Sequence, residues 1–253
     1  MRSSQLSLAQ YDSDKTVSGY LERYDQIFEP FIKSKIVLLE LGVHKGGSLL
    51  LWRDYFPMGT IVGIDINLPK DFKADDRIHV FEGSQANHQF LSHVANVTAP
   101  EGFDIIIDDA SHIGELTKAS FWHLFDNHLK PGGLYVIEDW GTGYWDDWPD
   151  GKNLNLEEYS QPKFKRSHFW SLLLKVFGKL QFITPMRRMH CHDYGMVGFI
   201  KQLIDEQDAH DVTKRSLKGK SQRESKFENM IIMPSLLFIK KASHQTTTCQ
   251  SFS

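Results

Sequence analysis

Two pairs of acidic residues stand at the ends of apolar runs in this chain of 253 residues. Asp108 and Asp109 end one Ile-rich run, and Glu138 and Asp139 end another. If both runs are neighbouring parallel strands, the four carboxylates lie at one edge of a sheet, where mutual repulsion would keep some of them protonated. A divalent cation removes that conflict, and oxygen ligands favour Mg²⁺ or Mn²⁺ over zinc. The alternative is that some of these acids cap the helices that follow.

A glycine-rich turn runs from Glu40 to Ser48, between an apolar run and an amphipathic stretch. Ligands of open α/β sheets bind beyond the carboxyl ends of the strands, where glycine lets the backbone approach and a helix amino terminus offers N–H groups. The spacing of Gly42 and Gly46 departs from the dinucleotide pattern G-x-G-x-x-G, which counts against NAD. Asp65, at the end of the next apolar run, is placed to accept both hydroxyls of a ribose. Together these features favour an adenosine-type cofactor; alternatively, they form a tight turn and a capping aspartate.

The elements that would position these residues alternate along the chain. Short apolar runs at 36–41, 60–65, 78–82, 103–109 and 134–139 are separated by turns, such as 130–133, and by amphipathic stretches. Continuous Ile/Val runs are typical of strands buried on both faces, so the pattern predicts a mostly parallel sheet with helices on both sides. Helices are predicted at 17–33, 48–53, 87–97, 167–180 and 197–207, and a closing antiparallel hairpin at 227–241.

The predicted organisation is a single domain over residues 1–241. It comprises a cofactor-binding core at 34–139, an aromatic and acidic lid or substrate loop at 140–165, and the closing hairpin. A basic stretch at 213–226 is predicted to be a linker, and the polar tail at 242–253 is predicted to be disordered.

Three motifs in this core resemble the nucleotide site of class I S-adenosylmethionine-dependent methyltransferases. They are the E-x-G-x-x-x-G turn at 40–46, the acid in the Gly-Ile-Asp-Ile string at 63–66, and Gly-Ser-Gln at 83–85. The resemblance covers about residues 14–145 and implies an α/β, Rossmann-like, doubly wound, mostly parallel seven-stranded sheet with an antiparallel last strand, which the hairpin matches. It implies that the cofactor is bound by Glu40, Gly42, Gly46, Ser48, Asp65, Ser84, Gln85 and Asp108.

Within that class, the D-D-x-S-H string at 108–112, together with 137–140 and 144–145, is similar to metal-dependent sugar O-methyltransferases of macrolide biosynthesis. Asp14-Lys15 and the stretch from Tyr20 to Tyr24 are similar to a short motif of the same group. The cephalosporin hydroxylase and catechol O-methyltransferase-like branches share a looser resemblance.

This family resemblance implies methyl transfer from S-adenosylmethionine to a hydroxyl of a small molecule, a sugar or natural-product intermediate. The metal ligands it implies are Asp109, Glu138 and Asp139, with Mg²⁺ or Mn²⁺ as the ion; whether Asp108 or Asp109 binds the metal stays open. His112, three positions after Asp109, is the expected base, because a metal-coordinated hydroxyl has a lowered pKa and a neighbouring histidine can take its proton. Aromatic faces pack against sugar rings, so Trp140, Tyr144 and Trp145 are expected to contact the substrate, as is Tyr20; the alternative for the aromatic loop is a locally packed lid without substrate contact.

Composition limits the other partners. The chain has 29 basic and 32 acidic residues, a net charge of −3, which gives no general attraction to nucleic acid or to anionic membranes. It has only 2 cysteines, no signal-peptide pattern and no apolar run of the roughly 20 residues that span a membrane. We therefore expect a cytoplasmic enzyme with a small-molecule acceptor. The sequence does not decide whether the chain forms a homo-oligomer. The alternatives are a cephalosporin-hydroxylase-like or nicotinamide-dependent oxidoreductase, and a non-catalytic S-adenosylmethionine-binding protein.

Overall fold

The computed structural model describes residues 2–70, 72, 75–152, 193–214 and 216–243. The predicted helix at 167–180, the later part of the loop predicted at 140–165 and most of the tail predicted at 242–253 lie outside the described residues.

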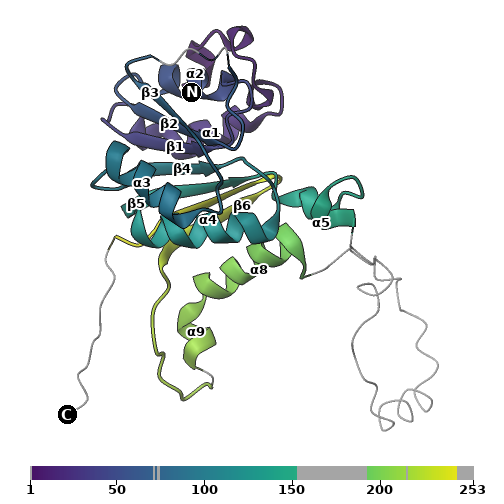
Figure 1. The fold of residues 1–253 in the computed structure, drawn as a ribbon. Coiled ribbons are helices and arrows are strands. Elements are labelled where there is room, and N and C mark those ends of the chain that lie inside the picture. The colour runs from purple at the N-terminus through teal and green to yellow at the C-terminus, as the bar shows by residue number, and fades with distance from the viewer. Residues whose placement is uncertain (1, 71, 73–74, 153–192, 215, 244–253) are drawn as a thin grey trace.

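One sheet of seven strands forms the centre of the fold (Figure 1). Its spatial order is β3-β2-β1-β4-β5-β7-β6. The strands β1 to β5 pair in parallel, whereas β7 is antiparallel to both β5 and β6. Their bounds are β1 Val37–Leu41, β2 Thr60–Asp65, β3 Ile78–Glu82, β4 Phe103–Asp108, β5 Leu129–Glu138, β6 Phe227–Met233 and β7 Leu236–Lys241. The predicted fold class, including the reversed last strand, is confirmed.

Helices cover both faces of this sheet, because alternate strand residues point to opposite sides. Leu38 of β1 packs in a core with aromatic residues of α1 and α2, whereas Leu39 packs in a second core with α3, α4 and α8. The described α-helices are α1 Tyr20–Phe28, α2 Gly47–Tyr55, α3 His88–Thr98, α4 Gly114–Asn127, α5 Pro149–Lys152, α8 Gly195–Gln207 and α9 Ala209–Lys214. The described 3-10 helices are η1 Ser3–Gln5, η2 Leu8–Gln10, η3 Asp14–Thr16, η4 Glu29–Phe31 and η5 Trp140–Tyr144. Among these helices, none combines the length and the apolar character that crossing a membrane requires.

Two predicted elements differ from the structure in their bounds. The helix predicted at 17–33 is shorter, because Gly19 precedes it at a φ of 74° and a 3-10 turn containing Pro30 follows it. The turn predicted at 130–133 lies inside β5: Phe103 pairs with Leu129 and then Ile105 with Leu134, so the residues between form a bulge. In both cases the sequence shows where the glycine or proline lies, but not whether it ends a helix or forms a bulge inside a strand.

The strand order reverses between β1 and β4, so the connections after these two strands leave on opposite faces. Such a switch point opens a crevice beyond the carboxyl ends of the strands. The glycine-rich turn follows β1 and the Asp109 string follows β4, which brings both candidate sites to this crevice.

Candidate functional site

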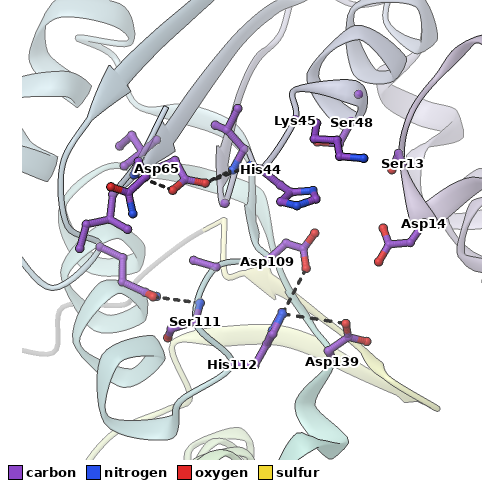
Figure 2. Close-up of a pocket in the computed structure, with 18 of the residues that line it drawn as sticks. Ser13, Asp14, His44, Lys45, Ser48, Asp65, Asp109, Ser111, His112 and Asp139 are labelled. Atoms are coloured by element: carbon purple, nitrogen blue, oxygen red, sulfur yellow. Dashed lines mark hydrogen bonds and ion pairs between the residues drawn. The ribbon is translucent and has the colours of Figure 1, made fainter. Parts of the chain in front are cut away.

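A cavity of about 730 Å³ lies at this switch point (Figure 2). It is lined by the segments 12–15, 42–45, 47–48, 64–67, 83–85 and 109–112, with Leu116 and Asp139. Its volume is within the usual range for small-molecule and cofactor pockets, roughly 300–1,000 Å³.

The glycine-rich turn forms one wall of the cavity through an unusually close backbone approach. Gly42 has a φ of 95°, and a Cβ there would lie 2.1 Å from the backbone oxygen of Asp109, so any other residue would push β1 away from the β4–α4 connection. Ser48 at the start of α2 lines the cavity. Gly46 does not line the cavity. A Cβ on Gly46 would lie 2.2 Å from a ring carbon of Phe72.

Asp65 organises this turn and also faces the cavity. Its Oδ2 accepts the backbone N–H groups of Val43 at 2.8 Å and His44 at 3.0 Å, and its Oδ1 accepts that of Asn67 at 2.9 Å. A carboxylate offers about four acceptor positions. Capping and ligand binding, the two roles weighed for Asp65, therefore share one side chain, and about one acceptor position is left for a ligand.

Of the other residues expected to bind the cofactor, Ser84 and Gln85 line the cavity, whereas Glu40 and Asp108 do not. Gln85 accepts the backbone N–H of Ser111 at 3.2 Å, which ties the segment after β3 to the segment after β4. Glu40 is fully buried and accepts hydrogen bonds from Ser48 Oγ at 2.7 Å and Trp52 Nε1 at 3.0 Å. Glu40 therefore supports the turn through its hydrogen bonds to Ser48 and Trp52, outside the cavity.

The structure separates Asp108 from Asp109. Asp108 is buried against α4, where Ser120 Oγ donates to it at 2.7 Å and Tyr135 Oη at 3.2 Å. Burial raises the pKa of Asp108 to about 6. Asp109 faces the cavity instead. Of the two, Asp109 is the one placed to meet a ligand.

Asp109 belongs to two clusters of possible metal ligands. Ligand atoms of Asp109, His112 and Asp139 all lie within 4.8 Å of one another, and so do those of Glu40, Asp109 and Glu138. The three expected ligands Asp109, Glu138 and Asp139 are thus divided between the clusters. Asp109 and Asp139 face the cavity, whereas Glu138 is 1% exposed. Burial and the charge of Asp109 raise the pKa of Glu138 well above its usual value.

His112 lies between the two acids that face the cavity (Figure 2). Its Nε2 is 3.7 Å from Asp109 Oδ1 and 4.0 Å from Asp139 Oδ2. Its backbone oxygen accepts hydrogen bonds from Thr142 Oγ1 at 3.1 Å and Trp148 Nε1 at 3.2 Å. The imidazole is therefore held at the cavity by residues that follow β5.

A buried lysine at the acid clusters was not anticipated as a site residue. Lys15 is 1% exposed, and its Nζ contacts Asp109 Oδ2, with Glu138 Oε1 at 3.1 Å and Glu40 Oε1 at 3.5 Å. Burial alone would lower the pKa of Lys15, but the three carboxylates raise it well above its usual value. The sequence signal was the Asp14-Lys15 pair, which pointed to a family motif without indicating what the lysine contacts.

Tyr20 and Tyr24 reach the same acids from α1. Tyr20 Oη donates a hydrogen bond to Asp139 Oδ1, and Tyr24 Oη donates one to Glu138 Oε1 at 2.5 Å. Burial, followed by these acids, raises the pKa of both phenols, so both stay protonated donors at physiological pH. Tyr20, expected to contact substrate, is 8% exposed and is outside the described lining of the cavity.

The aromatic residues after Asp139 are also outside the described lining. Trp140 Nε1 donates to the backbone oxygen of Met233 at 3.0 Å, which anchors η5 to the β6–β7 turn. Tyr144 and Trp145 are 36% and 52% exposed. Their assignment to the substrate stays a prediction.

No family model matches the chain. Over 133 residues, or 50% of its length, the chain is 41% identical to mycinamicin VI 2''-O-methyltransferase of Micromonospora griseorubida. It is 40% identical over 133 residues to demethylmacrocin O-methyltransferase of Streptomyces fradiae. The structure of MycE methyltransferase from the mycinamycin pathway, in complex with Mg and SAH, superposes with a TM-score of 0.61 at 27% identity over 87% of this chain.

The predicted resemblance to macrolide sugar O-methyltransferases is confirmed. The fold and the matched half of the chain are shared with these sugar O-methyltransferases. The chain spans 32% of the length of the Micromonospora relative, 33% of the Streptomyces one and 49% of MycE. A second MycE structure, with Mg, SAH and mycinamycin VI, gives a TM-score of 0.59 over the same share of this chain.

Proposed function

We propose that this chain transfers a methyl group from S-adenosylmethionine to a hydroxyl of a sugar-bearing natural product, with a divalent cation. One observation carries the proposal: an imidazole and two carboxylates converge within 4.8 Å on a cavity at the switch point of a methyltransferase fold. The MycE structures, which hold Mg and SAH, support the choice of cofactor and ion. The acceptor class follows the names of the sequence relatives.

The donor set fits the proposed ion. Asp109 and Asp139 offer oxygen atoms at the cavity, Glu138 offers one within 4.8 Å of Asp109, and carboxylate oxygens are ligands that Mg²⁺ and Mn²⁺ prefer. These three residues would hold the ion. When bound, a divalent cation lowers the pKa of a coordinated hydroxyl and so makes it a better nucleophile. Burial, followed by the charge of Asp109, raises the pKa of Glu138, and a cation bound beside it would favour its ionised form.

The cavity also fits the proposed methyl donor. The turn at Gly42 gives close access to the backbone, Asp65 keeps acceptor capacity, and Ser84 and Gln85 also line the cavity. Methyl transfer from a sulfonium is an in-line displacement, so the two reacting groups must be held collinear. A cavity bounded by six separate segments can impose that alignment.

His112 is the proposed general base. Its Nε2 is held beside Asp109 and Asp139, so an acceptor hydroxyl between these acids would place its proton within reach of the imidazole. The same carboxylates would stabilise the imidazolium that forms after proton transfer. Asp109 thus orients the base as well as holding the ion.

Calorimetry tests the cofactor and the ion separately. We expect S-adenosylhomocysteine to bind the purified chain, with NADH as the control ligand that does not. Turnover is then measured with demethylated glycosylated macrolides, with and without a chelator. Absence of S-adenosylhomocysteine binding would refute the function, and turnover that survives thorough chelation would refute only the role of the cation.

A further inference from the structure

Side chains of one segment near the amino terminus contact all three acids proposed to bind the cation. Lys15 lies in η3, and Tyr20 and Tyr24 lie one turn apart on one side of α1. Their partners stand on two neighbouring strands: Asp109 after β4, and Glu138 and Asp139 at the end of β5. Residues 14–24, here called the clamp segment, therefore bridge the amino-terminal part of the fold and the rim of the sheet.

Each acid is held through one particular oxygen. Lys15 contacts Oδ2 of Asp109, and the other oxygen of Asp109 faces His112. Tyr20 holds Oδ1 of Asp139, whose Oδ2 likewise faces His112. The clamp segment thus fixes the rotation of both carboxylates and turns one oxygen of each toward the cavity.

The third acid is held in the same way, by two donors at one oxygen. Tyr24 and Lys15 both contact Oε1 of Glu138, at 2.5 and 3.1 Å. Tyr24 itself cannot move easily, because its fully buried ring packs against Phe28 and Trp52 with centroids 4.7 and 5.0 Å away. Its hydroxyl is a fixed point from which Glu138 is oriented.

We propose that Tyr20 and Tyr24 of the clamp segment are positioning residues that orient Asp139 and Glu138 for uptake of the cation, so that docking of α1 and cation binding strengthen each other. The inference rests on the proposed function, since it presumes that these acids bind a divalent cation. Partners behind metal-binding side chains commonly matter this much: their loss costs roughly 10- to 100-fold in metal affinity. The mutual strengthening follows from linkage, because whatever favours one event must favour the other equally.

Charge and orientation act in opposite directions here. The ammonium of Lys15 lowers the negative charge that attracts a cation, whereas the two phenols orient carboxylates without changing the charge. The phenol hydroxyls are therefore the cleaner test. Tyr20→Phe and Tyr24→Phe keep the rings and remove only the donated hydrogen bonds.

The first measurement is Mn²⁺ binding by the full chain, by electron paramagnetic resonance, without cofactor or acceptor. We expect Tyr20→Phe and Tyr24→Phe each to weaken Mn²⁺ binding roughly tenfold or more. Tyr55→Phe is the matched control, because Tyr55 is a buried tyrosine of the same aromatic cluster whose hydroxyl donates to Asp25 at 2.7 Å. It loses a comparable bond to a carboxylate that is not among the acids, so its Mn²⁺ affinity is expected to equal that of the wild type.

A double-mutant cycle separates positioning from general stability. If Tyr20 acts through Asp139, then Tyr20→Phe weakens Mn²⁺ binding in the wild type but has no further effect in an Asp139→Asn background. Hydrogen exchange gives the reciprocal readout: Mn²⁺ is expected to slow exchange across residues 14–28 in the wild type, and less so in the Tyr20→Phe variant.

The outcomes are distinct. Unchanged Mn²⁺ affinity in both phenylalanine variants, or an equal loss in Tyr55→Phe, would overturn the positioning role and leave the proposed function intact. A wild-type chain that binds no Mn²⁺ would overturn both this inference and the cation in the proposed function.

Discussion

Replacing Lys15 by methionine removes the only ammonium among the described contacts of three carboxylates that are mostly or wholly buried. At an effective dielectric constant of about 20, each contact at 3–4 Å is worth about 4–6 kcal/mol of attraction before desolvation is counted. Burying the ammonium costs several kcal/mol, so the net contribution is smaller than the sum of the contacts. Removing one partner of a buried ion pair typically destabilises a protein by about 3–5 kcal/mol, and we expect a loss of that size.

The assay is urea unfolding with chelator present, with Lys45→Met as the control. Lys45 pairs with Asp12 at 3.0 Å, but both side chains are more than half exposed, so its loss is expected to change the free energy of unfolding by at most about 1 kcal/mol. The loss in Lys15→Met is also expected to grow with pH. Without the ammonium the pKa of Glu138 in the native variant rises further above its value in the unfolded chain. Between these two pKa values the native variant binds more protons than the unfolded chain, so its stability falls as pH rises through this wider pH range. A Lys15→Met variant as stable as Lys45→Met would refute this account of the cluster.

Three further predictions concern single residues of the site. Asp108→Asn should remove a pH dependence of stability. Burial raises the pKa of Asp108 from 3.8 to about 6, so the free energy of unfolding of the wild type falls by up to about 3 kcal/mol as pH rises between these values. The variant should not show this fall in urea titrations at several pH values. Asp109→Ala should abolish turnover and Mn²⁺ binding yet leave S-adenosylhomocysteine affinity within a few-fold in calorimetry; a large loss of that affinity would place Asp109 at the cofactor instead. His112→Ala should lower the single-turnover rate by roughly 10²- to 10⁴-fold with little change in acceptor binding, and an unchanged rate would remove His112 from the mechanism.

The sheet and its switch point could be predicted because each strand signal is local. The strands β2 and β3 begin and end where their apolar runs do, and acids at the ends of parallel strands must meet at one rim. The cavity accordingly contains Asp65, Asp109, His112 and Asp139, all of which the sequence singled out.

The contacts that hold the acids could not be predicted in the same way. Lys15 and Asp109 are separated by 94 positions, and Tyr20 and Asp139 by 119. Nothing in local periodicity specifies that α1 packs with these side chains toward the strand ends. The family resemblance predicts that Tyr20 contacts substrate and Glu40 the cofactor; in the structure both are buried and bonded to other side chains. Sequence pattern identified the acids; long-range packing decides which oxygen of each is turned toward the cavity.

The strained backbone conformations around the cavity likewise depend on contacts with distant parts of the chain. In the part of the chain that the structure describes, His44, His112 and Asp139 are non-glycine residues with φ between 48° and 50°, and all three line the cavity. Such a conformation costs of order 1–3 kcal/mol per residue and persists only where the surroundings enforce it.

Each of these three residues is held by a hydrogen bond from another element. Asp65 accepts the N–H of His44, Trp148 donates to the carbonyl of His112, and Tyr20 donates to the side chain of Asp139. Relaxing any of them to negative φ would swing its side chain away from the position it now holds at the cavity. The strain is therefore tolerated where it orients the proposed base, a proposed ion ligand and one wall of the cavity, as a site organised before its ligands arrive requires.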